Sequence, residues 1–294
     1  MLLTCLQSGF AQVRANGRIL WVYYLSNLCF GLLLVLPLRF LLGNFIDDSE
    51  MGERLGGRLD MDFLFEFIKQ NLASFSALSG LLLVVAVGYG LCNLFLSGGA
   101  FATFARQERY TAGFFWGSAA KYFGRFVRLA LWSLPVLVAL FCVQYLETGI
   151  RLLIFGNGAY QYITYWGGWI RTVVLAASLG VFAMILDYAR IHIVRRDENS
   201  MRLALWEGIT FTFRNFPSTG SLAFAMSVIA GAALLLYNPI ANGLNAPNGW
   251  VVFLLFACQQ VYMFFRMGLR LMLFAGETHL YQDNVSRYTS REIV

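Results

Sequence analysis

The chain has 294 residues, of which 59% are hydrophobic and 13% are charged, and its formal charge at pH 7 is +6. Soluble domains are about one quarter charged, and apolar surface on this scale would aggregate in water. The composition therefore excludes an ordinary water-soluble domain. The basic residues form no stripe on a soluble domain, so no nucleic-acid partner is expected.

Six apolar stretches approach or reach the roughly 20 residues that a helix needs to cross a hydrocarbon core. Their apolar residues are continuous and do not alternate, which favours helices over barrel strands. The predicted spans are residues 19–42, 75–97, 128–147, 169–190, 219–238 and 250–270. We expect one integral membrane domain over 1–294, an all-α polytopic membrane helix bundle.

The distribution of Arg and Lys predicts how the chain is threaded, since basic residues gather on the cytoplasmic side. Of the 22 basic residues, six lie on the side opposite the termini: Arg39, Arg54, Arg58, Lys69, Arg151 and Arg171. The other sixteen lie on the side of the termini. We therefore expect a multi-pass protein of the bacterial inner membrane with both termini cytoplasmic, including a tail at 277–294.

Residues 114–129 form the most regular amphipathic pattern. Lys121, Arg125 and Arg128 share one face, and aromatic residues such as Phe115 and Phe126 occupy the other. A helix lying in the membrane interface has such faces, and so has an elbow packed against neighbouring spans. Residues 6–18 and 198–216 repeat the pattern more weakly.

The fourth span ends in charge, without a glycine or proline to stop it. Asp187 and Arg190 are about one helical turn apart and can pair. We expect Arg190, Arg195 and Arg196 to lie at the membrane surface among anionic lipids. The alternative is an ion site that includes Asp187, since acids inside a membrane are often functional.

An internal repeat is the second hypothesis on organisation. The chain reads three times as interfacial helix, span, outside loop and span. An aromatic–x–Arg tripeptide closes the second span of each unit, at 104–106, 188–190 and 264–266.

Two outside loops have distinct compositions. Residues 43–74 are acidic, and within them 61–71 should form a short surface helix. Residues 155–169 are rich in Tyr and Trp, and Trp250 follows later. These aromatic residues fit an outer interfacial belt or, alternatively, a binding surface for a pigment, a quinone or a sugar.

Catalytic and metal-binding patterns are missing from the sequence. The two histidines and five cysteines have no ligand spacing, so neither a metal nor another cofactor is expected. Asn93, Gln144 and Asp187 are the main candidates for polar groups inside the membrane. Asn93 and Gln144 suit hydrogen bonds between helices, although they could instead line a small path.

Residues 113–129 and 185–208 carry a family resemblance. They resemble uncharacterised bacterial six-span membrane proteins that are similar to the membrane domain associated with some glycerophosphodiester phosphodiesterases. The resemblance implies a shared architecture and a link to membrane or lipid processes. The catalytic barrel of those enzymes is absent, so it does not imply phosphodiesterase activity.

Three functions remain in competition. The first is a non-catalytic scaffold, assembly factor or subunit of a larger membrane complex, whose partners would be other membrane protein subunits. The alternative is a transporter or lipid-handling permease component. The third, an intramembrane enzyme, requires Asp187, Glu147 or His192 to converge on one cavity.

Overall fold

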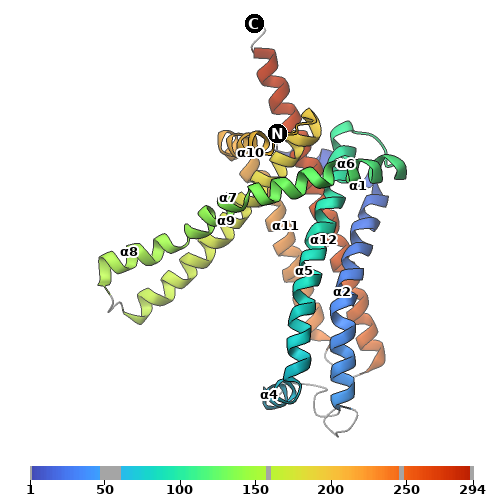
Figure 1. Cartoon of the computed structure of the whole chain (residues 1–294), viewed down its shortest axis with the longest axis vertical. Helices are drawn as coiled ribbons and strands as arrows, with labels where there is room; N and C mark the ends of the chain where they lie inside the picture. Colours follow the sequence, from blue (N-terminus) through green and yellow to red (C-terminus); the bar gives the residue numbers. More distant parts are fainter. Residues whose placement is uncertain (1, 47–60, 157–159, 245–247, 292–294) are drawn as a thin grey trace. The chain divides into compact units, whose positions relative to one another are not determined.

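A computed structural model describes residues 2–46, 61–156, 160–244 and 248–291, and every element within these ranges is a helix. Figure 1 shows the helices in chain order. They are α1 (Leu2–Ala15), α2 (Gly17–Ile46), α4 (Met61–Gln70), α5 (Leu72–Arg106), α6 (Ala112–Trp132), α7 (Leu134–Cys142), α8 (Tyr145–Phe155), α9 (Gln161–Arg196), α10 (Met201–Arg214), α11 (Phe216–Gly243) and α12 (Gly249–Arg291).

The prediction of an all-α polytopic membrane protein is confirmed. The described residues contain six helical stretches that are long and apolar enough to cross a membrane. They are Gly17–Asn44, Leu72–Arg106, Ala112–Phe155, Gln161–Arg196, Phe216–Gly243 and Gly249–Val285. In each stretch the chain itself buries only 6% to 22% of the most apolar window. Most of this apolar surface is therefore left for lipid or partner helices to cover.

The third stretch is interrupted where the sequence predicts one continuous span. Ser133 separates α6 from α7, and Pro135 lies in the first turn of α7, where its missing N–H is tolerated. A second break at Val143 and Gln144 separates α7 from α8. The predicted span 128–147 therefore covers parts of three helices.

The last helix is longer than predicted. The expected tail at 277–294 is helical as far as Arg291, so α12 does not end near residue 270. Glu277, Thr278 and Leu280 are each about 1% exposed. Buried residues at helical spacing continue the packed face of the helix past the predicted end of the span.

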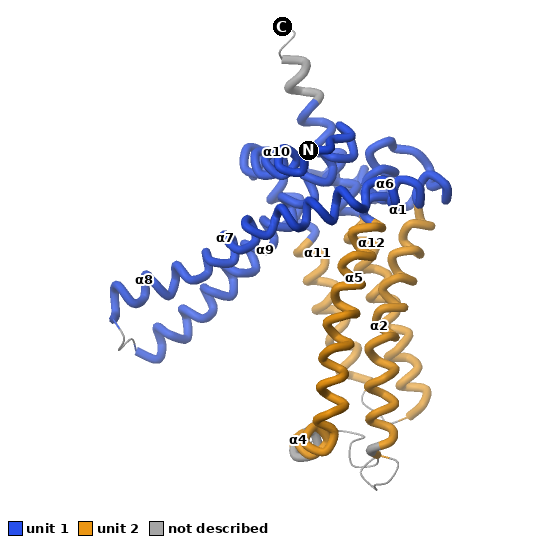
Figure 2. Tube along the Cα trace, viewed as in Figure 1, with its two compact units in different colours: residues 1–15, 97–226, 272–294 blue, residues 16–96, 227–271 orange. Residues whose placement is uncertain are grey.

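The chain divides into two compact units, coloured separately in Figure 2. Unit 2 comprises residues 16–96 and 227–271. Hydrogen bonds link its helices: Tyr24 donates to Gln260 at 2.8 Å, and Tyr89 donates to Asn27 at 3.1 Å. These are the interhelical hydrogen bonds expected of polar residues in membrane helices.

Unit 1 comprises residues 1–15, 97–226 and 272–294. Its core contains fully buried aromatic side chains, including Phe101, Phe104 and Phe126. A glycine permits close packing of α10 on α9, because a Cβ at Gly208 would lie only 2.6 Å from the Ile185 carbonyl oxygen. Small residues at such crossings let helix backbones approach closely.

The threefold repeat stays a prediction, and the tripeptides do not mark equivalent places. Helices α1 and α10 each precede two long apolar stretches, whereas α6 is itself the first part of the third stretch. Phe104 and Tyr188 are buried in unit 1, whereas Phe264 is half-buried in unit 2 and contacts Trp21. The third tripeptide therefore matches the first two in sequence but not in its structural position.

The predicted surface helix in the first outside loop is present as α4, Met61–Gln70. Five of the acidic residues of that loop lie outside the described residues: Asp47, Asp48, Glu50, Glu53 and Asp60.

Candidate functional site

The amphipathic helix α6 packs as an elbow within unit 1. Its aromatic face is buried, with Phe115 and Phe126 at 0% exposure and Tyr122 at 7%. Ser118, which shares the predicted basic face, is also buried at 9%, since it lies one turn from Phe115 and Tyr122. The packing fits the elbow interpretation, and a position of α6 in the membrane interface stays a prediction.

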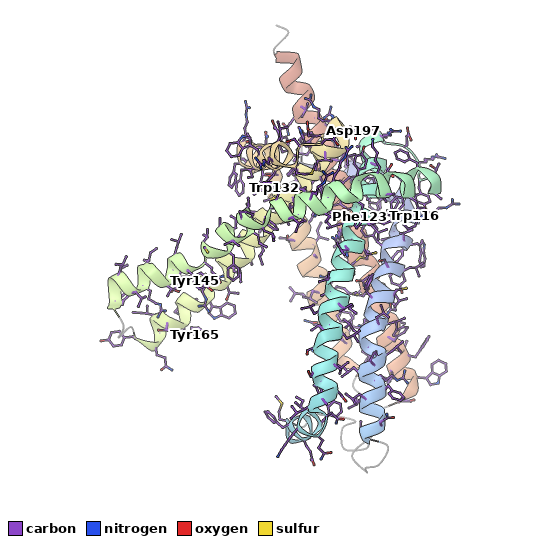
Figure 3. All side chains as sticks on the ribbon, viewed as in Figure 1. Trp116, Phe123, Trp132, Tyr145, Tyr165 and Asp197 are labelled. Carbon is purple, nitrogen blue, oxygen red and sulfur yellow. The ribbon has the colours of Figure 1, made fainter. Side chains whose placement is uncertain are left out.

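The Asp197 side chain, at the end of α9, contacts the basic face of α6. It accepts hydrogen bonds from Lys121 Nζ at 3.0 Å and from Arg125 Nη1 at 2.6 Å. Asp197 ends α9 in the left-handed conformation, with φ 52° and ψ 34°, which aspartate tolerates better than most residues. Hydrogen bonds from Lys121 and then Arg125 lower the pKa of Asp197. Figure 3 shows Asp197 at the end of α9 remote from Tyr165.

The remaining residues predicted for the membrane interface divide into two groups. Arg128 donates to the Gly124 carbonyl oxygen of its own helix, and Arg195 lies over the Tyr281 ring at 5.8 Å. Arg195 and Arg196 end α9 beside Asp197. Arg190, in contrast, is buried, with its side chain 12% exposed.

Asp187 and Arg190 form the predicted pair, with 2.8 Å between Arg190 Nη1 and Asp187 Oδ1. Their side chains are only 10% and 12% exposed, and the guanidinium also lies 5.9 Å from the Phe126 ring centroid. The pair is therefore packed against neighbouring helices inside unit 1. The reason is that α6 and α12 cover this end of α9.

A second acid belongs to the same buried region. Glu277 of α12 is 1% exposed, and Asp187 and Arg190 are the charged groups that act on it electrostatically. Three buried atoms here have no hydrogen-bond partner: Glu277 Oε2, Arg190 Nε and the Tyr188 hydroxyl oxygen. Asp187, Tyr188, Arg190 and Glu277 are called the buried charge cluster below. Sequence reasoning missed Glu277 because it assigned residue 277 to a solvated tail.

An aromatic chain extends from the buried charge cluster to His192. Tyr188 packs on Phe211, which packs on Tyr281, with ring centroids 4.8 Å and 4.7 Å apart. The hydroxyl group of Tyr281 lies 2.9 Å from His192 Nδ1 in a buried hydrogen bond. His192 is 7% exposed, so it belongs to the packed core of unit 1.

Asn93 and Gln144 lie in different units. Asn93 Oδ1 accepts a hydrogen bond from Arg270 Nη1 at 2.9 Å, and its Nδ2 donates to the Tyr89 carbonyl oxygen at 2.8 Å. Asn93 thus takes part in a hydrogen bond between helices, which is one of the two roles predicted for it. Gln144 is 6% exposed at the break that precedes α8.

Helices α8 and α9 border a groove of about 420 Å³. Isoleucine and aromatic side chains make up most of its wall: Ile150, Ile154, Phe155, Ile163, Trp166 and Ile170. One ion pair lies among them, with 3.3 Å between Arg151 Nε and Glu147 Oε1. The sequence predicted aromatic residues here but treated 155–169 as a loop, whereas α9 already begins at Gln161.

Gly167 allows the Glu147 carboxylate to lie against the backbone of α9, because a Cβ at residue 167 would overlap Glu147 Oε1. Gly167 and Asp187 lie on the same continuous helix, twenty residues apart. At 1.5 Å per residue this separation is about 30 Å. Glu147 and Asp187 therefore do not converge on one cavity, as an intramembrane enzyme that used both would require.

Among the described residues, no three His, Cys, Asp or Glu side chains come close enough together to hold a metal ion. The comparisons with known proteins add no family: no family model, no curated protein and no solved structure matches the chain.

Proposed function

We propose that this protein is a non-catalytic subunit, scaffold or assembly factor of a membrane complex. The observation that supports this most directly is how few residues are buried in α7, α8 and the first half of α9, which together are called the hairpin. Within the hairpin, α7 and α8 contain no buried residue. In α9, only Gly167 and Ser178 are buried before Met184.

Because the helices of the hairpin bury so few residues, their large apolar side chains remain exposed. On the face of α8 opposite Arg151, Leu153 is 88% exposed, and Tyr165 of α9 is 61% exposed. In a membrane, helices associate through close packing and interhelical hydrogen bonds. The exposed surface of the hairpin, which includes Leu153 on α8 and Tyr165 on α9, is the surface that we assign to a helix of another subunit.

The polar groups of the spans support a packing role. Asn27, Asn93 and Gln260 are all engaged in hydrogen bonds within unit 2. We further propose the bacterial inner membrane, cytoplasmic termini and anionic lipids at the arginine-rich side, on the basis of the basic residues alone. The resemblance to the phosphodiesterase-associated membrane domain remains a prediction of architecture.

Site-specific photo-crosslinking in native membranes tests the partner surface. A benzophenone amino acid at Leu153 or Tyr165 should yield adducts with one or a few membrane proteins, identified by mass spectrometry. The matched control is Leu235 of unit 2, which is 72% exposed and should yield lipid adducts. Lipid adducts alone from all three positions, together with a lone monomer after mild-detergent purification, would refute the proposal.

A transporter or lipid-handling permease is the second candidate, and the buried charge cluster favours it. Ionisable groups buried in spanning helices often belong to ion or proton relays. Reconstituted vesicles would then show a flux that Glu277→Gln reduces. A flux that persists both in this variant and after Asn93→Leu with Gln144→Leu would count against this candidate.

A further inference from the structure

Helix α10 has two apolar faces, of which unit 1 buries only one. Gly208 and Phe211 belong to the face that is packed inside the unit. Leu203, Trp206 and Phe213 are 49%, 68% and 55% exposed. At about 100° per residue they fall within an arc of about 80° on the opposite side of the helix. The solvent side of a helix in water is normally polar, so this outer face of α10 requires an apolar environment.

The size of the outer face favours lipid over a protein partner. Three large side chains with half to two thirds of their surface exposed offer roughly 350 Å². A stable protein interface covers about 800 Å² on each partner. Tryptophan also prefers the level of the lipid headgroups, where the indole ring lies among apolar groups and its N–H finds a polar acceptor.

The connections of α10 agree with a position in the lipid interface. The helix has 14 residues and is about 21 Å long, which is too short to cross a hydrocarbon core of about 30 Å. It follows α9, which ends at Arg196, and precedes α11, which begins at Phe216. Both neighbours are candidate membrane spans. A short helix tied at each end to a span can reach the boundary between headgroups and acyl chains.

One arginine borders the outer face and is oriented by stacking. Arg202 precedes Trp206 by about one helical turn, and its guanidinium carbon lies 4.4 Å from the centre of the Trp132 ring of α6. Figure 3 labels Trp132 beside α10. A guanidinium that is stacked on an indole keeps its in-plane N–H groups available for a bidentate contact with phosphate. Arg202 and Trp132 are both exposed, so the stacked arginine is accessible to a ligand.

The charges around Arg202 select an anionic headgroup. None of the ion pairs within the described part of the chain includes Arg202. The one acid of α10, Glu207, lies about 140° away from Arg202 around the helix. A zwitterionic headgroup would bring its ammonium group close to a guanidinium without a carboxylate. A phosphodiester on an uncharged alcohol, in contrast, neutralises the guanidinium.

We propose that the outer face of α10 inserts into the lipid interface and that Arg202, stacked on Trp132, binds the phosphate of an anionic phospholipid such as phosphatidylglycerol. Leu203, Trp206 and Phe213 then lie among the glycerol groups and the upper part of the acyl chains. This site rests on the proposed contact of the arginine-rich side with anionic lipids and gives that contact a specific place. It does not depend on the partner subunit that is assigned to the hairpin.

Fluorescence quenching tests the position of the outer face. The environment-sensitive amino acid Anap is incorporated at Leu203 or Phe213 of the full chain, which is then placed in nanodiscs that contain phosphatidylglycerol. We expect dibrominated lipid to quench it more strongly than water-soluble acrylamide, as at Leu235 of unit 2, which is 72% exposed and serves as the lipid reference. Stronger quenching by acrylamide at either position, with lipid quenching retained at Leu235, would overturn the proposal.

Native mass spectrometry tests the choice of headgroup. The full chain is released from nanodiscs with equal phosphatidylglycerol and phosphatidylethanolamine, and it should retain phosphatidylglycerol preferentially. Arg202→Gln should lower this preference about fivefold, as one partly exposed charge contact allows. Trp132→Leu removes no charge but should also lower the preference, because it removes the surface on which the guanidinium stacks.

Arg109→Gln is the matched control, since Arg109 is another exposed arginine of unit 1, and it should leave the preference unchanged. Equal retention of the two lipids by the wild type, or equal effects of Arg202→Gln and Arg109→Gln, would overturn the assignment of the phosphate to Arg202. A wild-type preference in Trp132→Leu would contradict the role of stacking. The chain is tested without partners, so failure here leaves the proposed membrane complex untouched.

Discussion

Removal of Arg190 should be the most damaging single change in the buried charge cluster. Arg190→Met leaves the carboxylates of Asp187 and Glu277, which are 7% and 1% exposed as residues, without the guanidinium. Breaking a buried ion pair by removing one partner costs about 3–5 kcal/mol. We expect a loss of that size in the free energy of unfolding, with methionine preserving most of the apolar volume.

Removal of either acid of the cluster should cost less, and this order of losses is the sharper test. Asp187→Leu removes the carboxylate that Arg190 contacts and leaves Glu277 as the remaining acid of the cluster, so a loss of about 1–3 kcal/mol is expected. Glu277→Leu removes an acid whose Oε2 has no hydrogen-bond partner, and should change stability by no more than about 1 kcal/mol.

Unfolding in mixed micelles by titration with sodium dodecyl sulfate, followed by circular dichroism, measures all three variants. Arg266→Met, at an exposed arginine of α12, is the control for loss of one positive charge and should be nearly neutral. Equal losses for the three cluster variants, or a loss from Arg190→Met no larger than that of the control, would refute the assignment of a buried pair.

Three further predictions use the same unfolding assay. Gly208→Ala should destabilise unit 1 by about 1–3 kcal/mol through overpacking, because its Cβ would meet the α9 backbone, whereas Gly117→Ala, with open space around it, should be neutral or stabilise slightly. Asp197→Asn should cost up to about 1 kcal/mol, since the side chain is 53% exposed. A lowered folded-state pKa of Asp197 stabilises the fold at pH values above the unfolded pKa of about 4. The difference in stability between the wild type and Asp197→Asn should therefore be constant at pH 6–8 and vanish as the pH falls through the folded pKa. A difference that grows in acid would contradict this prediction. Asn93→Leu removes the acceptor of Arg270 and should lower the stability of unit 2 by about 1 kcal/mol; an unchanged transition would show that this bond contributes nothing.

Hydropathy was sufficient to predict the six apolar stretches, because the length of a spanning helix is fixed by bilayer thickness. It could not locate the breaks at Ser133 and Gln144, where a single polar residue interrupts an apolar run. The pairing of Asp187 with Arg190 was predictable from their spacing on one helix. Its burial was not, because burial depends on α6 and α12, which are remote in sequence.

Glu277 was missed for a related reason. A charged residue beyond the last apolar run is usually solvated, and a count of charges near the span ends treats every such residue as exposed. In the structure α12 continues through Gly276, where an added Cβ would lie 3.4 Å from the Cys5 carbonyl oxygen. Contact with α1, at the other end of the sequence, therefore covers this part of α12.

The hairpin shows what average hydropathy does not distinguish. Leu153 and Ile154 are adjacent and equally apolar, yet Leu153 is 88% exposed, whereas Ile154, at 66%, lines the groove beside the Glu147–Arg151 pair. Lipid and a partner helix both satisfy an apolar side chain, so average hydropathy does not separate the two surroundings. Mass spectrometry of the molecules crosslinked at each of the two residues can identify them separately.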